Sequence, residues 1–133
     1  MCRTISLLLA ALLIAACGAG RPETLTRSQT VDGLTIAVEQ PQQVVALQDY
    51  DLIVTLTDAQ GNPVDGASVY LDLSMPGMTM GTNQPIADPL GDGRYRVRTV
   101  YSMEGDWLIA VHARTGGKEH VATFDLSVEL PRS

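Results

Sequence analysis

Apolar and polar residues alternate with a period of two along most of the chain after residue 33. Side chains on a β-strand point to opposite faces in turn, so this period predicts strands with one buried face. Turn residues separate the strands, as in residues 58–63 and at Gly116-Gly117. No stretch after residue 17 keeps the helical period of 3.6. The expected strands centre on residues 34–38, 52–56, 69–75, 95–101, 107–113 and 121–128.

Short alternating strands of this kind predict an all-β fold, an immunoglobulin-like β-sandwich of about seven strands. In the expected registers Trp107 points between the two sheets and fills much of the core. The last strand has an ambiguous register. Val121 is expected to point inward, and either Thr123 or Phe124 follows it on the same face.

The first 17 residues have the pattern of a bacterial secretion signal. An apolar run of about 12 residues, 5–16, follows Arg3. This run is shorter than the roughly 20 residues that cross a bilayer. It ends in Leu-Ile-Ala-Ala directly before Cys17, which resembles the lipobox of bacterial lipoproteins. We expect cleavage before Cys17 and a lipid on its thiol; the alternative is an ordinary signal in which the cysteine stands by chance.

This signal divides the chain into three parts. Residues 1–16 form the signal peptide, residues 17–31 the lipidated cysteine and a flexible tether, and residues 32–130 the β-sandwich domain. The tether is predicted because its residues are small, polar and aperiodic. The lipid is expected to hold the domain on the extracytoplasmic face of the cell membrane or the outer membrane.

The chain has 133 residues, a formal net charge of −6 and no run of basic residues. These features exclude nucleic acid as an expected partner, and they exclude attachment to anionic lipid by charge. Cys2 leaves with the signal and Cys17 carries the lipid, so no disulfide is expected.

The sequence offers no set of nucleophile, base and orienting group. Its carboxylates lie on the outer faces of expected strands and in turns. Pairs such as Asp49 with Asp51, or Asp88 with Asp92, fit solvated groups better than an acid–base pair in a cleft. We therefore expect that the protein is not an enzyme.

Methionine is concentrated in one short segment, residues 75–81, which holds three of the five methionines of the chain. Thioethers are soft, uncharged ligands that suit Cu(I). If the chain crosses the sandwich once between Pro76 and Gly93, the following strand brings Met103 back to this loop. The candidate copper ligands are Met75, Met78, Met80 and Met103.

Neither histidine is expected to join these ligands. His112 lies seven residues beyond Gly105, on a strand that leads away from the loop by about 3.3 Å per residue, roughly 23 Å in all. Its parity is opposite to that of Trp107, which places it on the outer face. His120 follows the Gly116-Gly117 turn at the far end.

Two other interpretations of the methionines stay open. Methionine also fills irregular gaps in a core, and Met75 continues the inward parity of its strand. The four side chains would then cap the core and shield it from water. Exposed methionines also suit an adaptable surface for a protein partner.

These segments together resemble a known family, the YtkA-like domain, which is related to FixH-like domains. The resemblance lies in residues 75–81 (Met-Pro-Gly-Met-Thr-Met-Gly), in Gly93-Arg94-Tyr95 and in residues 103–107 (Met-Glu-Gly-Asp-Trp), and it extends over roughly residues 32–129. It implies an immunoglobulin-like sandwich outside the cytoplasm, with links to copper handling or to respiratory oxidase assembly. FixH-like relatives are typically anchored by a transmembrane helix, whereas this chain has a segment that resembles a lipobox.

Two functions from different classes are consistent with the sequence. The first is a non-enzymatic, lipid-anchored extracytoplasmic domain that binds Cu(I) at its methionines, for copper handling or oxidase assembly. The alternative is a structural or interaction module that docks on an envelope protein partner, with the methionines only capping the core.

Overall fold

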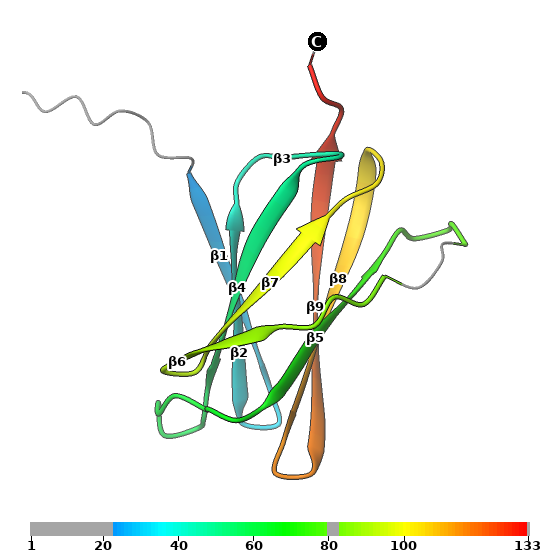
Figure 1. Ribbon diagram of the computed structural model, residues 1–133. Coiled ribbons are helices and arrows are strands. Elements are labelled where there is room, and N and C mark those ends of the chain that lie inside the picture. The colour runs from blue at the N-terminus through cyan, green and yellow to red at the C-terminus, as the bar shows by residue number, and fades with distance from the viewer. Residues whose placement is uncertain (1–22, 80–82, 133) are drawn as a thin grey trace, which may run out of the picture.

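The computed structural model describes residues 23–79 and 83–132, which form two β-sheets packed face to face (Figure 1). The predicted signal peptide, Cys17 and Met80 lie outside these residues. The strands are β1 Thr24–Val31, β2 Leu34–Pro41, β3 Val44–Val45, β4 Asp49–Thr57, β5 Ser68–Ser74, β6 Asp88–Gly91, β7 Arg94–Val100, β8 Gly105–Thr115 and β9 Lys118–Glu129.

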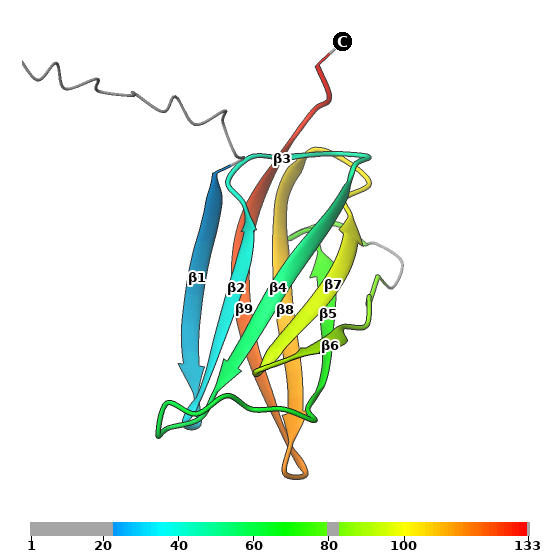
Figure 2. The ribbon, with the colours of Figure 1, turned by 60° about the vertical axis from the view of Figure 1, so that its left-hand side comes forward.

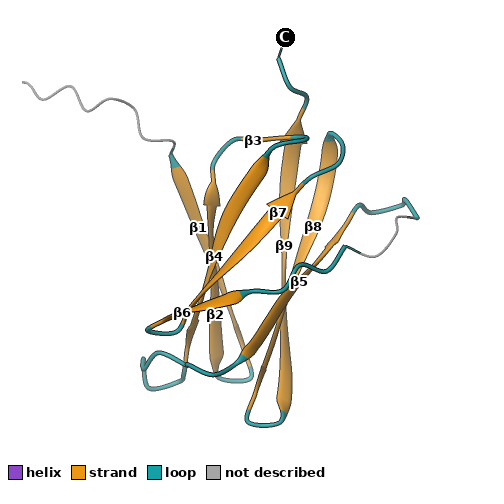
Figure 3. Ribbon diagram, viewed as in Figure 1, coloured by secondary structure: helices purple, strands orange, loops and turns teal. Residues whose placement is uncertain are grey.

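The first sheet has the strand order β1-β2-β4-β7-β6 and the second has the order β3-β9-β8-β5. Neighbouring strands pair antiparallel, except that the short β3 lies parallel to the end of β9. The two layers are seen from a second side in Figure 2, and Figure 3 shows only strands and loops in the described part of the chain. The predicted all-β sandwich is confirmed.

The described residues form nine strands, where the sequence predicted about seven. Six of them correspond to the segments expected from the sequence, and the strands that no expected segment covers are β1, β3 and β6, each of which lacks the alternating pattern on which the prediction rested. β3 has two residues, and all four residues of β6 are exposed. In residues 23–79 and 83–132 no helix is long and apolar enough to cross a bilayer.

The tether predicted for residues 17–31 is wrong over its last eight residues, which form β1. β1 pairs with β2 along its whole length, from Thr24 opposite Pro41 to Val31 opposite Leu34. Most side chains of β1 are exposed, so the backbone hydrogen bonds of the ladder hold the strand and its sequence shows no buried face. The two-residue turn at Asp32 and Gly33, both with positive φ, fixes the register.

The core lies between the sheets, and Trp107 is fully buried in it, as predicted. The expectation for Val121 is wrong, because its side chain is exposed and points outward. On β9 the inward residues are His120, Ala122, Phe124, Leu126 and Val128. The two-residue turn between Thr115 and Lys118 sets this register, and it selects Phe124 over Thr123.

Side chains of β1 close the gap between the two sheets on one side, next to β9. The Arg27 guanidinium forms an ion pair with Asp125, with 2.9 Å between Nη1 and Oδ1, and it also donates to the main-chain carbonyl of Asp125. The Gln29 amide pairs with the backbone of Thr123, where Nε2 donates to O at 2.6 Å and Oε1 accepts from N at 3.3 Å. Gln29 thus provides hydrogen-bond partners for the N–H and C=O groups of Thr123, which point away from β8.

On the other side of the sandwich, residues 83–87 run back along the outer edge of β5. Leu73 N donates to Asn83 O at 3.1 Å, and Ala87 N donates to Val69 O at 2.9 Å. The chain then joins the first sheet as β6. The single crossing predicted between Pro76 and Gly93 is therefore confirmed.

The described strand pairs and core side chains all lie between residues 24 and 129. This segment contains a complete core of two sheets, and it can therefore fold as an independent unit.

Gly93, in the β6–β7 turn, is required by both its backbone conformation and its surroundings. Its φ is +71°, and a Cβ there would lie 2.6 Å from the carbonyl oxygen of Leu56. We expect Gly93→Ala to lower the free energy of unfolding by about 3 kcal/mol, measured by urea denaturation. Gly61 has a φ of +83° but open space around it. Gly61→Ala should cost only about 1 kcal/mol, and equal losses in the two variants would contradict this explanation.

Candidate functional site

Met75 is the last core residue of its strand. It follows β5 directly, and only 8% of its surface is exposed. Its methyl group lies so close to Gly105 that a Cβ at Gly105 would sit 2.6 Å from it. The glycine at the start of β8 therefore leaves the room that Met75 occupies. Met75 caps the core at this end of the sandwich.

Met78 and Met103 differ from Met75 because their side chains are exposed, by 52% and 39%. Met75 and Met78 are joined by a turn, in which the N–H of Met78 donates to the Met75 carbonyl at 3.2 Å. Met103 lies two residues before Gly105. The two loops that carry the exposed sulfurs therefore meet at the contact between Met75 and Gly105. Met80, the other predicted ligand, is outside the described residues.

The aromatic side chains of Trp107 and Tyr101 pack beneath the Met103 loop. The indole Nε1 of Trp107 donates to the Met103 carbonyl at 3.0 Å. The Tyr101 ring packs edge-on against Trp107, with 5.3 Å between centroids. Both rings are fully buried, and burial raises the pKa of the Tyr101 hydroxyl to about 12. This hydroxyl has no hydrogen-bond partner in the described part of the chain.

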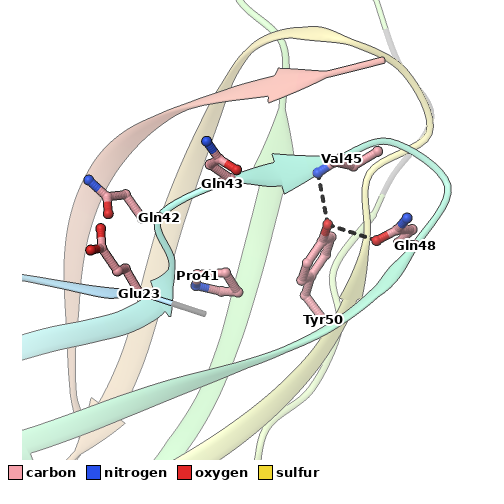
Figure 4. Close-up of a pocket in the computed structure, with 7 residues that line it drawn as sticks. All are labelled: Glu23, Pro41, Gln42, Gln43, Val45, Gln48 and Tyr50. Atoms are coloured by element: carbon pink, nitrogen blue, oxygen red, sulfur yellow. Dashed lines mark hydrogen bonds between the residues drawn. The ribbon is translucent and has the colours of Figure 1, made fainter. Parts of the chain in front are cut away.

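A pocket of about 670 Å³ with mixed polar and apolar lining opens at the same end of the sandwich, beside the start of β1 (Figure 4). Tyr50 stands in its wall, where its hydroxyl accepts a hydrogen bond from Val45 N at 2.8 Å and donates to Gln48 Oε1 at 3.2 Å. Amide groups and one carboxylate make up the rest of its polar lining, which gives it dipoles but no nucleophile paired with a base. Its lining residues are Glu23, Pro41, Gln42, Gln43, Val45, Gln48 and Tyr50.

His112 lies on the outer face of the second sheet, as predicted, and there it belongs to a cluster that the sequence did not reveal. Its Nδ1 lies 2.8 Å from a carboxylate oxygen of Glu119. Its ring stacks on Tyr70, with 4.5 Å between centroids. The hydrogen bond from His112 is the main reason that the pKa of Glu119 lies below its usual value. The sequence could have revealed this cluster only through the pairing of Tyr70 with His112 across β5 and β8. That pairing depends on the register of the two strands, which the sequence alone does not give.

His120 also lies apart from the methionines. It is buried on β9, near the β8–β9 turn, and it pairs with Ala113 on β8. Among the described residues no three His, Cys, Asp or Glu side chains come together as a metal-binding group. Of the methionines that the sequence offered as metal ligands, Met75 is buried in the core, and Met78 and Met103 have exposed side chains.

The fold and this end of the molecule define a two-sheet β-domain whose loops present exposed methionines. A family model described as YtkA-like matches residues 28–112, which is more than half of the chain. The chain therefore belongs to the YtkA-like family, as the resemblance in its loops predicted, and this membership indicates an extracytoplasmic β-domain. Searches of curated proteins and of solved structures gave no match.

Because the buried hydroxyl of Tyr101 has no hydrogen-bond partner among the described residues, we predict that its removal does not destabilise the protein. Tyr101→Phe removes a buried polar group without a partner, so we expect the free energy of unfolding to stay the same or to rise by about 1 kcal/mol. Tyr95 is a matched control, since its hydroxyl donates to Val64 O at 2.8 Å and accepts from Ala67 N at 3.1 Å. Tyr95→Phe should lose about 1–2 kcal/mol in the same denaturation experiment. A loss in Tyr101→Phe as large as in Tyr95→Phe would show that the Tyr101 hydroxyl is paired.

Proposed function

We propose that this protein is a non-enzymatic, lipid-anchored extracytoplasmic domain that binds Cu(I) through the thioethers of Met78 and Met103. One observation carries the proposal. Both side chains are exposed on loops that meet at the contact between Met75 and Gly105. Cys17 supplies the lipid anchor in this proposal, and the membership in an extracytoplasmic family is consistent with it.

The chemistry of the two sulfurs favours Cu(I) over harder cations, because thioethers are soft and carry no charge. The Met103 loop is fixed from below by the hydrogen bond from Trp107, so ion binding there costs little ordering of the backbone. Two protein sulfurs leave coordination positions open. A site of this kind suits the transfer of copper to or from a partner better than permanent storage.

The alternative is an interaction module that docks on an envelope protein. The burial of Met75 favours it, since one of the four predicted ligands caps the core. In this alternative Met78 and Met103 would supply an adaptable apolar contact to the partner.

A titration of residues 18–133 with Cu(I) against a chromogenic competitor tests the proposal. We expect one ion per molecule, and we expect the double variant Met78→Leu, Met103→Leu to weaken binding at least tenfold, which corresponds to about 1.4 kcal/mol. Trp107 is the only tryptophan of the chain and bonds to the Met103 loop, so its fluorescence should change as the ion binds.

Met75→Leu is the matched control, because it removes a buried sulfur while keeping the volume nearly constant. It should leave the affinity for Cu(I) within about twofold. Full affinity in the double variant would place the copper site elsewhere. No binding at micromolar Cu(I) would favour the interaction module.

A further inference from the structure

Exposed apolar side chains gather at one end of the sandwich. In the described part of the chain nine large hydrophobic residues are exposed, and six of them lie at the end where β1 begins and β7 and β9 finish. Figures 1 and 2 show this end with the start of β1, the β3 connection and the β7–β8 connection side by side. We call these six residues the apolar rim: Leu25, Leu47, Met78, Val100, Met103 and Leu130.

Leu47 is the most exposed member of the apolar rim, at 71%. Its backbone has a φ of +67°, a left-handed conformation that is unfavourable for a leucine. Two backbone hydrogen bonds hold it there, from Leu47 N to Tyr101 O at 2.8 Å and from Ala46 N to Glu129 O at 2.9 Å. The fold thus projects a large apolar side chain into solvent from a strained, well-fixed turn. Strain of this kind at an exposed position indicates an interaction outside the domain.

The position of the N-terminal chain identifies what covers the apolar rim. Thr24 begins β1 at this end, and the carbonyl of Glu23 accepts a hydrogen bond from Gln42 N at 2.8 Å. Only seven residue steps separate Cys17 from Thr24, so the chain between them spans at most about 25 Å. A lipid on Cys17 would therefore keep this end of the sandwich, and not the opposite end, close to the bilayer.

We infer that the apolar rim lies on the surface of the lipid bilayer, with Leu47 inserted at the boundary between headgroups and acyl chains. This inference rests on the membrane anchorage in the proposed function. Insertion to this depth is typical of apolar side chains on peripheral proteins. Asp49 and Glu104 flank the rim, so the contact depends on apolar insertion and not on attraction to anionic lipid. The open face of the copper site would then be directed toward the membrane.

A spin label placed at residue 47 measures this contact directly. Residues 18–133 contain no cysteine, so Leu47→Cys gives one labelling position, and Val121→Cys gives a matched exposed apolar position near the opposite end. An N-terminal histidine tag binds the protein to phosphatidylcholine vesicles that contain a nickel-chelating lipid. This replaces the lipid on Cys17, so the result does not depend on lipidation or on copper binding.

We expect vesicles to shield the label at position 47 from aqueous chromium oxalate at least fivefold and to raise its collisions with oxygen, while the label at position 121 stays accessible. Equal accessibility of the two labels on vesicles would overturn the inference. Shielding of position 47 without vesicles would also overturn it, because a second copy of the chain would then cover the rim.

Leu47→Asn separates membrane contact from stability. Asparagine adopts positive φ more readily than leucine, so this variant should melt at the same temperature or higher. Transfer of a leucine side chain from water to an apolar environment is favourable. Its replacement by a polar side chain should therefore lower partitioning of untagged protein into phosphatidylcholine vesicles about tenfold. Val121→Asn should leave partitioning unchanged, and neither result should depend on salt. Unchanged partitioning in Leu47→Asn would contradict the inference.

Discussion

The hydrogen bond from Trp107 to the Met103 carbonyl connects the core of the sandwich to the end that carries its exposed sulfurs. Trp107 is fully buried, and its ring packs edge-on against Tyr101. The main-chain carbonyl of Tyr101 in turn accepts a hydrogen bond from the backbone N–H of Leu47. The positions of the β7–β8 and β3–β4 connections therefore depend on one pair of aromatic rings. A β-domain without a disulfide in its described part gains from this arrangement, because loops at the end of a sandwich otherwise have few buried contacts.

The same end combines three features that are separate in the sequence. Met75 belongs to the core, Met78 and Met103 to exposed loops, and Leu47 to a strained turn. The return of residues 83–87 along β5 brings the methionine loops together, since it reduces the path between Pro76 and Gly93 to one crossing. The topology of the sandwich, and not any local motif, thus creates the surface to which we assign copper and lipid contact.

Most of the fold could be predicted from the sequence, because the alternation of apolar and polar residues shows directly which side chains of a strand are buried. The inward faces of β5, β7 and β8 and the burial of Trp107 follow from parity alone. β1 could not be predicted in this way, since its exposed side chains leave no alternating pattern and its stability comes from backbone pairing. The direction of Val121 was predicted wrongly because adjacent apolar residues on β9 fit either face until the hairpin fixes the register.

For the candidate site, the residue types could be predicted from the sequence, but the burial and exposure of their side chains could not. The density of methionines and the return of Met103 to the loop could be inferred, whereas the burial of Met75 depends on the space left by Gly105. The pairing of Tyr70, His112 and Glu119 needs the register of three strands, and no local pattern encodes it. The exposure of Leu47 likewise depends on a backbone conformation that leucine rarely adopts.

The side chains of β1 also bear on how copies of this domain could associate if they are anchored to a membrane as proposed. Anchorage confines proteins to a plane and raises their local concentration, which favours polymerisation through free strand edges. Gln29 occupies the backbone groups of Thr123, and Arg27 covers the next pair along at Asp125. A neighbouring chain that approached β9 would first have to displace these side chains. This edge of the second sheet is therefore not free to pair with a strand of another copy.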